Sequence, residues 1–174
     1  GQAPREEVAI QVIDRFGLRD TTVPQLVAAI RRTIIANIGV LPDVRTALAS
    51  ARSAGFRIVC VTNGSHAQQQ RKIDVTGLAE RLDGVVVSET AGVSKPDPGI
   101  FRIAAELADR PLRDAWMVGD SADADIAGAA SVGANTAWLS RGRTWPLPNP
   151  SPTIEARTFS AAISGILAAQ RAAS

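Results

Sequence analysis

The chain has 174 residues, of which 45% are hydrophobic and 21% charged, and its formal net charge is +2. This composition excludes a disordered chain, and no apolar run reaches the ~18–20 residues that a membrane-spanning helix needs. Cys60 is the single cysteine, so the chain forms no internal disulfide and needs no oxidising compartment. We therefore expect one soluble domain in the cytoplasm, with at most a small lid, and no role at a membrane.

Basic residues are spread along the sequence rather than gathered in one segment. Lys72 and Lys95 are the only lysines, and Arg31 with Arg32 is the only pair of adjacent arginines. Proteins that bind nucleic acids usually concentrate basic charge on one face. We therefore expect no nucleic-acid partner.

Two helices without an intervening strand are predicted first in chain order. Apolar residues recur at helical spacing over Pro4–Phe16 and Val23–Ile38, and Gly17 can end the first helix. The two segments predict a helical unit that precedes the rest of the fold.

After Pro42, predicted helices and short apolar strands alternate. The helices are expected at 42–54, from Gly64 to Gln70, at 98–108, at 125–132 and at 161–173, and the strands at 56–62, 85–87, 115–119 and 135–139, with a proline-rich loop at 146–152. Strands that alternate with helices predict an α/β fold with a parallel sheet.

Three of the predicted strands end in or lead to polar residues that can carry chemistry. Thr62, Asn63 and Gly64 follow the first strand, Lys95 lies beyond the second, and Asp120 to Asp125 follow the third. Each segment alone is ordinary: a turn, a surface lysine, and an acidic helix start. Because ligands of open parallel sheets bind beyond the carboxyl ends of the strands, we expect the three segments to meet.

Together these residues predict a site for an anion and a cation. Thr62 and the backbone amides that follow it can bind phosphate oxygens, and Lys95 adds a positive charge. Asp120 and Asp125 offer carboxylate oxygens, which suit Mg²⁺ when water and a substrate phosphate complete its shell. The parts are those of a phosphoryl-transfer site.

This arrangement resembles the haloacid dehalogenase (HAD) superfamily of hydrolases. Val61–Gly64 matches the second family motif, Val93–Phe101 with Lys95 the third, and Gly119–Ser121 with Asp125–Ala129 the fourth. The resemblance covers about residues 41–145. It implies a Rossmann-like core, a Mg²⁺ cofactor and attack by an aspartate on the phosphate of a small phosphorylated substrate.

The resemblance also implies roles for individual residues. With Asp120 and Asp125 both present, the chain is similar to the Mg²⁺-dependent, phosphoglycolate-type phosphatases rather than to the metal-free dehalogenases. Asp120 is then a catalytic metal ligand, and Asp125 holds the metal directly or through water. Thr62, Asn63, Gly64 and Lys95 then bind phosphate, and Lys95 also steadies the nucleophile.

The first family motif, an apolar strand that ends in Asp-x-Asp and supplies the nucleophile, is absent from the sequence. Asp123 and Asp125 have the spacing but lie inside the fourth motif, and Asp14 falls in a predicted helix. We therefore expect a partial helical cap over residues 1–39 and a core over residues 40–174 that lacks its first strand. Alone, this chain is expected to be inactive.

In the family, the missing strand lies between the strands that end at Thr62 and Gly119. Three explanations stay open: an upstream segment, which the lack of an initiator methionine supports, since Met117 is the only methionine; another strand, from the N-terminal segment or a swapped partner; or a remnant without catalytic activity. The alternative function is accordingly a catalytically inactive HAD-fold binding module. The oligomeric state, a homodimer included, also stays open.

Two further segments lie near the expected site. Trp138–Trp145 encloses Arg141 and Arg143, and we expect it to pack over the sheet edge, with contact to a substrate or partner as the alternative. Glu89 follows the strand at 85–87, on the side of the site, and is a candidate to face the cap.

Overall fold

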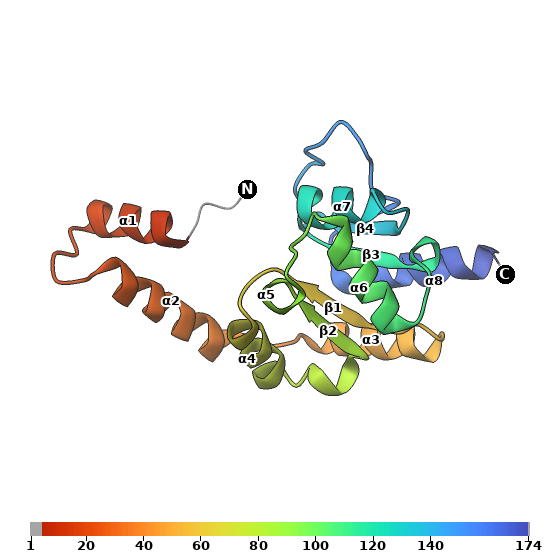
Figure 1. Cartoon of the computed structure of the whole chain (residues 1–174), viewed down its shortest axis with the longest axis horizontal. Coiled ribbons are helices and arrows are strands. Elements are labelled where there is room, and N and C mark those ends of the chain that lie inside the picture. The colour runs from red at the N-terminus through yellow and green to blue at the C-terminus, as the bar shows by residue number, and fades with distance from the viewer. Residues whose placement is uncertain (1–4, 174) are drawn as a thin grey trace. The chain divides into compact units, whose positions relative to one another are not determined.

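The computed structural model describes residues 5–173 and divides into two compact units, one up to Gly39 and one from Val40 onward (Figure 1). The first unit contains α1 (Arg5–Phe16) and α2 (Val23–Asn37), which pack against each other. Thr22 and Gln25 form a reciprocal capping box at the start of α2. Pro4, the predicted start of the first helix, lies outside the described residues.

The second unit has the predicted alternation of strands and helices. Its elements are α3 (Pro42–Ser53), β1 (Val59–Thr62), α4 (His66–Thr76), η1 (Ala79–Arg81), β2 (Gly84–Val87), α5 (Ser88–Ala91), α6 (Pro98–Ala108), η2 (Leu112–Asp114), β3 (Trp116–Gly119), η3 (Ala122–Ala127), α7 (Gly128–Ala130), β4 (Asn135–Leu139), β5 (Ile154–Ala156) and α8 (Phe159–Ala173). Every paired strand is parallel to its neighbour. The predicted α/β class is confirmed.

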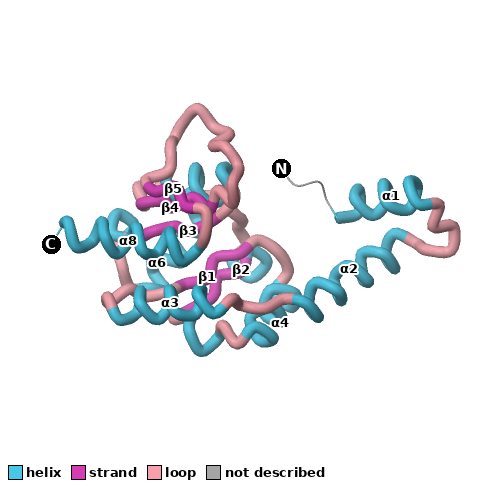
Figure 2. The backbone as a smooth tube through the Cα atoms, turned by 180° about the vertical axis from the view of Figure 1, so that it is seen from behind, coloured by secondary structure: helices cyan, strands magenta, loops and turns pink. Residues whose placement is uncertain are grey.

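The strands form two separate parallel sheets. One has the order β1–β2, and the other has the order β3–β4–β5 (Figure 2). In the part of the chain that the structure describes, no strand pairs with the second edge of β1 or with the second edge of β3. The sheet is therefore open at the place where the sequence lacks a strand.

Helices cover both faces of these strands and supply two apolar layers. On one face, Ile100 and Phe101 of α6 pack with Val59 and Val61 of β1 and with Met117 of β3. On the opposite face, Ala47 and Ala51 of α3 and Ile163 and Ile166 of α8 pack together. They contact Ile58, just before β1, and Trp116 and Val118 of β3. Because β3 contributes to both layers, and the β1 segment contributes Val59 and Val61 to one and Ile58, just before the strand, to the other, helix packing holds the two sheets together without pairing between them.

Backbone hydrogen bonds show which groups of β1 and β3 lack a strand partner. The carbonyl of Ile58 accepts from the Asp83 N–H at 2.7 Å, so Ile58 faces β2. Along a parallel strand, the backbone N–H and C=O groups of successive residues point to opposite neighbours. Those of Val59 and Val61 therefore point away from β2. The Asn135 N–H donates to the Ala115 carbonyl, so Ala115 points toward β4. The backbone groups of Trp116 and Val118 therefore point away from β4. We call the space between these four residues the central slot.

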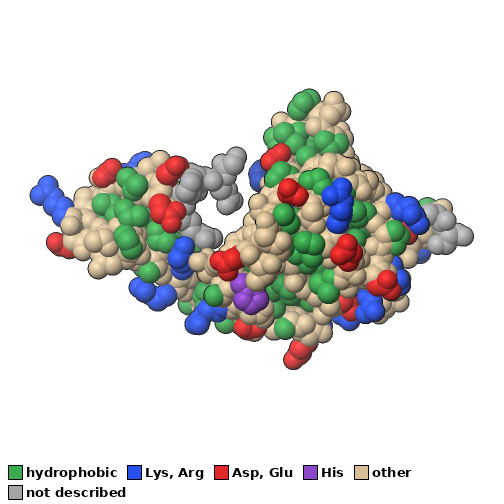
Figure 3. Space-filling model, viewed as in Figure 1, with side chains coloured by type: hydrophobic (Ala, Val, Ile, Leu, Met, Phe, Trp, Pro, Cys, Tyr) green, Lys and Arg blue, Asp and Glu red, His purple; other side chains and the backbone are tan. Residues whose placement is uncertain are grey.

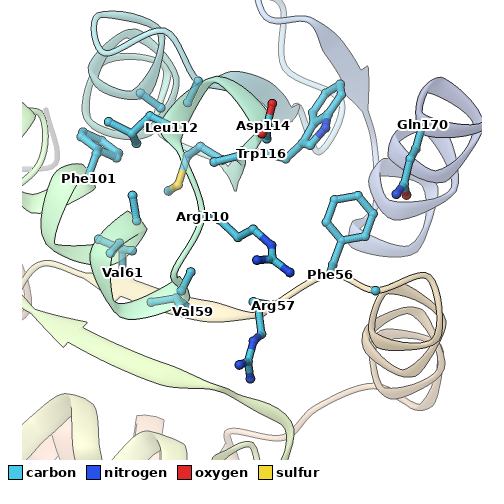
Figure 4. A pocket seen from close by; sticks show the side chains of 18 residues that line it. Phe56, Arg57, Val59, Val61, Phe101, Arg110, Leu112, Asp114, Trp116 and Gln170 are labelled. Carbon is cyan, nitrogen blue, oxygen red and sulfur yellow. The ribbon is translucent and has the colours of Figure 1, made fainter. Parts of the chain in front are cut away.

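A cavity lies on each face of the central slot. The one on the α6 side has a volume of about 330 Å³ and is lined by Val59, Val61, Met117 and Phe101 (Figure 4). The other, also about 330 Å³, lies on the α3 and α8 side. Alternate side chains of an extended strand point to opposite faces, so a strand in the slot would fill both cavities.

Several predicted boundaries were wrong. The first strand is shorter than 56–62, because β2 begins only at Gly84 and leaves Phe56 and Arg57 without a partner strand. The strand β5 follows the proline-rich loop and was not predicted. Instead of an α-helix at 125–132, η3 is a π-helical turn in which the Ile126 N–H donates to the Ser121 carbonyl.

Acidic and basic side chains are interspersed on the face of the molecule shown in Figure 3. Among the described residues, no single helix is long and apolar enough to cross a membrane, and only α2 and α3 taken together, with a bend between them, meet that test of length and composition.

Candidate active site

Lys95, which forms the second of the three segments expected to meet, contacts both of the others. Its backbone N–H donates to the Asn63 Oδ1 at 2.9 Å, and its carbonyl accepts from the Asn63 Nδ2 at 2.9 Å. Its Nζ donates to the Val61 carbonyl at 2.8 Å and pairs with the Asp125 Oδ1 at 2.8 Å. The ends of β1 and β3 and the loop before α6 are thus tied together by one side chain.

Asp125 is held in a buried position beside the end of β3. Its side chain is 8% exposed, and that of Lys95 is 11% exposed. The Asp125 Oδ2 accepts from the Ser121 N–H at 3.0 Å, across the π-helical turn. A Cβ atom at Gly119 would collide with this carboxylate, so glycine is required where the carboxylate packs against the strand. Both oxygens of Asp125 therefore have protein partners.

Asp120 is the first residue after β3, and its surroundings differ from those of Asp125. Its carbonyl accepts from Trp138 Nε1 at 3.2 Å and from Arg143 Nη2 at 2.8 Å. Its carboxylate is 45% exposed and lies 3.7 Å from an Arg141 nitrogen and 3.9 Å from an Arg143 nitrogen. The backbone of Asp120 is fixed, while its carboxylate has loose, solvated partners.

The loop after β1 is braced by the start of α5. The Gly64 N–H donates to Ser88 Oγ at 2.9 Å, and the His66 N–H donates to Glu89 Oε2 at 2.8 Å. Two amides of this loop thus have protein acceptors, and Glu89, a candidate from the sequence to face the cap, accepts a hydrogen bond from the first residue of α4. In contrast, the Thr62 side chain makes no hydrogen bond with any described residue. Among the described residues, its hydroxyl therefore has no hydrogen-bond partner.

Gly64 has a φ of 138°, in the region that favours glycine, and a side chain there would collide with Gln69. Gln69 in turn donates from its Nε2 to the Asn63 carbonyl at 3.0 Å. The turn that follows Thr62 therefore depends on glycine for its shape, and Asn63 is held from both its side chain and its backbone.

The acidic residues offer oxygen ligands in a number that suits Mg²⁺. No cluster of three or more His, Cys, Asp and Glu side chains is found within residues 5–173. Mg²⁺ needs only one or two carboxylates, because water and substrate phosphate supply the remaining ligands. The half-exposed carboxylate of Asp120 fits direct contact with the ion, and the fully engaged carboxylate of Asp125 fits contact through water.

Cys60 lies in β1, one residue before Val61, whose carbonyl binds Lys95. Burial raises the pKa of the Cys60 thiol, and the nearby positive charge of Lys95 opposes that rise. The thiol is therefore protonated at neutral pH, which fits a packing role.

The family model of the haloacid dehalogenase-like hydrolases matches residues 5–133. The chain belongs to the haloacid dehalogenase-like hydrolases. This HAD hydrolase carries the predicted motifs on the predicted strand ends, so the resemblance seen in the sequence is confirmed.

Relatives of this HAD hydrolase are named for different phosphorylated substrates. The chain is 42% identical over 93 residues to the pyrimidine 5'-nucleotidase YjjG of Escherichia coli, a match that covers 53% of the chain and 41% of that protein. It is 37% identical over 124 residues to a glyceraldehyde 3-phosphate phosphatase of Methanopyrus kandleri, covering 69% and 53%. The chain thus spans about half the length of the curated relatives it matches.

Solved structures show the same fold. A HAD phosphatase from Thermococcus onnurineus superposes with a TM-score of 0.67 at 32% identity, over 74% of this chain and 58% of that one. The magnesium-bound YfnB of Bacillus subtilis superposes with a TM-score of 0.77 at 21% identity, over 97% of this chain and 74% of that one. The Rossmann-like HAD core is therefore established for this chain.

Proposed function

We propose that this HAD hydrolase is a Mg²⁺-dependent phosphatase that acts on a small phosphorylated metabolite through an aspartyl-phosphate. The observation that carries the proposal is the position of Lys95. A single buried ammonium group contacts the end of β1 and the acidic turn after β3. Phosphatase names among the matched relatives support the same reaction class.

The nucleophile is proposed to come from a segment that precedes Gly1 in the complete protein. The central slot supports this part of the proposal, because no described strand pairs with either of its edges and a cavity lies on each of its faces. A parallel strand in the slot would end between Thr62 and Asp120, beside the Lys95 ammonium. An aspartate at that end would be steadied by Lys95 and aimed at the substrate phosphorus.

The residues of this chain then bind and orient the phosphoryl group. Thr62 Oγ donates a hydrogen bond to a phosphate oxygen, and the Lys95 ammonium neutralises charge that develops in the transition state. Asn63 holds the Lys95 backbone at both its N–H and its carbonyl. Asp120 would hold Mg²⁺ directly and Asp125 would hold it through water, and the bound ion would neutralise charge on the phosphate oxygens.

Helices α1 and α2 are proposed to form part of a cap, with residues 1–39 as cap and residues 40–174 as core. Such a cap would exclude water from the site during phosphoryl transfer. The α1–α2 pair buries few large side chains and leaves Phe16 and Ile10 exposed, which is compatible with further covering by another part of the complete protein.

The test is an assay of the complete protein with p-nitrophenyl phosphate, with and without Mg²⁺. We expect Mg²⁺-dependent release of phosphate, a loss of at least about 100-fold in the Asp120→Asn variant, and no change in Asp114→Asn, which alters an exposed carboxylate at the end of η2. The 174-residue chain alone is expected to be inactive.

A complete protein that is inert, or an Asp120→Asn variant with an unchanged rate, would contradict the proposal. If the inert protein still binds inorganic phosphate in calorimetry, the alternative is supported: a HAD-fold module that binds a phosphorylated ligand without turnover.

A further inference from the structure

The segment after β4 places two arginines beside Asp120, and the structure fixes only one of them. Arg143 donates from Nε to the Ser140 carbonyl at 3.1 Å and from Nη2 to the Leu139 carbonyl at 3.2 Å. The same Nη2 donates to the Asp120 carbonyl at 2.8 Å, and the guanidinium lies 5.7 Å from the centre of the Trp138 ring. The Nε and Nη2 atoms of Arg143 thus bind the backbone at the ends of β3 and β4.

Arg141 has no comparable anchorage. Its side chain is 67% exposed, and its one polar side-chain contact among the described residues is the 3.7 Å approach to the Asp120 carboxylate. At that distance between exposed groups, the pair contributes little stability. Its guanidinium therefore keeps most of its donors for another anion.

The backbone at Arg141 is in an unfavourable conformation. Arg141 has a φ of 49° and Gly142 a φ of 84°, and the Arg143 N–H closes the turn onto the Ser140 carbonyl at 2.9 Å. Left-handed backbone costs a residue with a Cβ about 1–2 kcal/mol, and turns of this kind favour asparagine and glycine. An arginine in this position is thus unfavourable for folding, and such positions are typical of functional residues.

Charge at the site also distinguishes Arg141 from its neighbours. The Lys95 ammonium is paired at 2.8 Å with Asp125, and both groups are buried. The Arg141 guanidinium is the most exposed of the cations that contact the acidic residues after β3. It also lies 3.7 Å from the Asp120 carboxylate, which is itself 45% exposed.

We propose that Arg141 is a specificity residue that binds a second anionic group of the substrate, a carboxylate or a second phosphate, while the first phosphate occupies the site at Thr62 and Lys95. The inference rests on the proposed function and adds the class of substrate to it. A planar guanidinium binds either anion through two parallel hydrogen bonds. The preferred metabolite is therefore a short phosphate ester with a second negative charge.

The test compares three probes with the complete protein: phosphoglycolate, its uncharged amide, and ethane-1,2-diol bisphosphate. We expect Arg141→Asn to raise KM at least about tenfold for phosphoglycolate, the bisphosphate or both, with kcat within twofold and KM for the amide unchanged. The probe that loses affinity identifies the second anion as carboxylate or phosphate. Arg113→Asn, which removes an exposed arginine after β2 and before β3, should leave all values unchanged.

Two further measurements separate recognition from a structural role. Arg141→Asn should melt at or above the wild-type temperature, since asparagine tolerates a positive φ better. Arg143→Ala should slow all three probes alike, because it releases the Asp120 backbone. The proposal is overturned if Arg141→Asn raises KM for neither phosphoglycolate nor the bisphosphate, or raises KM equally for these two probes and the amide.

Failure of the proposed function gives a different result. If the wild-type protein hydrolyses none of the probes, calorimetric binding of all three probes still reports on Arg141. Tighter binding of phosphoglycolate or the bisphosphate than of the amide, lost in Arg141→Asn, would support the assignment, and equal binding of the three probes would refute it.

Discussion

Asp120 and Asp125 are five positions apart in one motif, yet they occupy opposite electrostatic environments. Asp125 is 8% exposed and has a lysine at 2.8 Å and a backbone amide at 3.0 Å. Asp120 is 45% exposed, and its nearest cations lie at 3.7 and 3.9 Å. A buried, fully paired carboxylate stabilises the fold, whereas an exposed one with loose partners is free to take a ligand. The Asp125 carboxylate is thus paired inside the protein, whereas the Asp120 carboxylate is accessible from solvent.

The largest expected effect comes from removing the partner of the buried carboxylate. Lys95→Met leaves Asp125 charged, buried and without its cation, which typically costs about 3–5 kcal/mol. We expect a corresponding fall in the free energy of unfolding, measured by urea denaturation, and loss of activity in the complete protein.

The double variant Lys95→Met with Asp125→Asn sharpens this test. Removing both charges leaves no uncompensated ion, so most of the lost stability should return while activity stays absent. A double variant as unstable as the sum of its single variants would show that the pair is not coupled.

Asp83 is a carboxylate at the opposite end of the sheet, outside the site, and serves as a purely structural reference. A hydrogen bond from the Ile58 N–H, aided by Arg57 and Arg52, lowers the pKa of Asp83 below its usual 3.8. Its stabilisation is therefore complete above pH 3.8 and is lost as the pH falls through the lower pKa of the folded state.

Asp83→Asn should cost about 1–2 kcal/mol at pH 7 and flatten the acid side of the stability profile. Melting curves between pH 2 and 7 measure both effects. Asp114→Asn, which affects a surface pair at 3.9 Å, should change neither. Equal acid sensitivity of the wild-type and Asp83→Asn proteins would contradict the assignment.

Unlike Lys95→Met, Asp120→Asn should leave the free energy of unfolding almost unchanged. Because the Asp120 carboxylate has only long contacts with exposed arginines, we expect a change in stability within about 0.5 kcal/mol. Calorimetric Mg²⁺ binding should weaken in the same variant. A destabilisation as large as that of Lys95→Met would remove the distinction between the two aspartates.

The smallest effect is expected at Cys60, which reports on the charge of Lys95. Burial raises the thiol pKa and Lys95 lowers it, so Lys95→Met should raise that pKa further. Alkylation with iodoacetamide at pH 8–9 should therefore be slower than in the wild-type protein, under conditions where both proteins are folded. An unchanged rate would show that the Lys95 charge does not reach the thiol.

Much of the fold is predictable because its signals are local. The helix Pro98–Ala108 and the strand Asn135–Leu139 have the predicted bounds, since a capping aspartate with a proline starts the first and a short apolar run forms the second. The strand Ile154–Ala156 has only three residues and exists through pairing with β4, a partner distant in sequence. The π-helical turn likewise depends on the Asp125 carboxylate, which bonds back to Ser121.

The sequence predicts which residues lie at the strand ends of the site, but not which of them form ion pairs. Thr62, Lys95, Asp120 and Asp125 follow the strand ends as expected, because parallel strands share one carboxyl edge. That Lys95 pairs with Asp125, while Asp120 lies by two arginines, depends on side-chain geometry. The sequence Arg-Gly-Arg after a strand does predict a turn. The pattern does not show that the turn places both arginines beside Asp120.

The two unpaired strand edges also have a consequence for the behaviour of the chain in solution. Free edges of this kind are templates for strand addition, and charged or proline residues that normally protect an edge are absent from Val59–Thr62 and Trp116–Gly119. The 174-residue chain on its own should therefore aggregate with rising concentration, through intermolecular β-structure, far more readily than a protein in which those edges are covered.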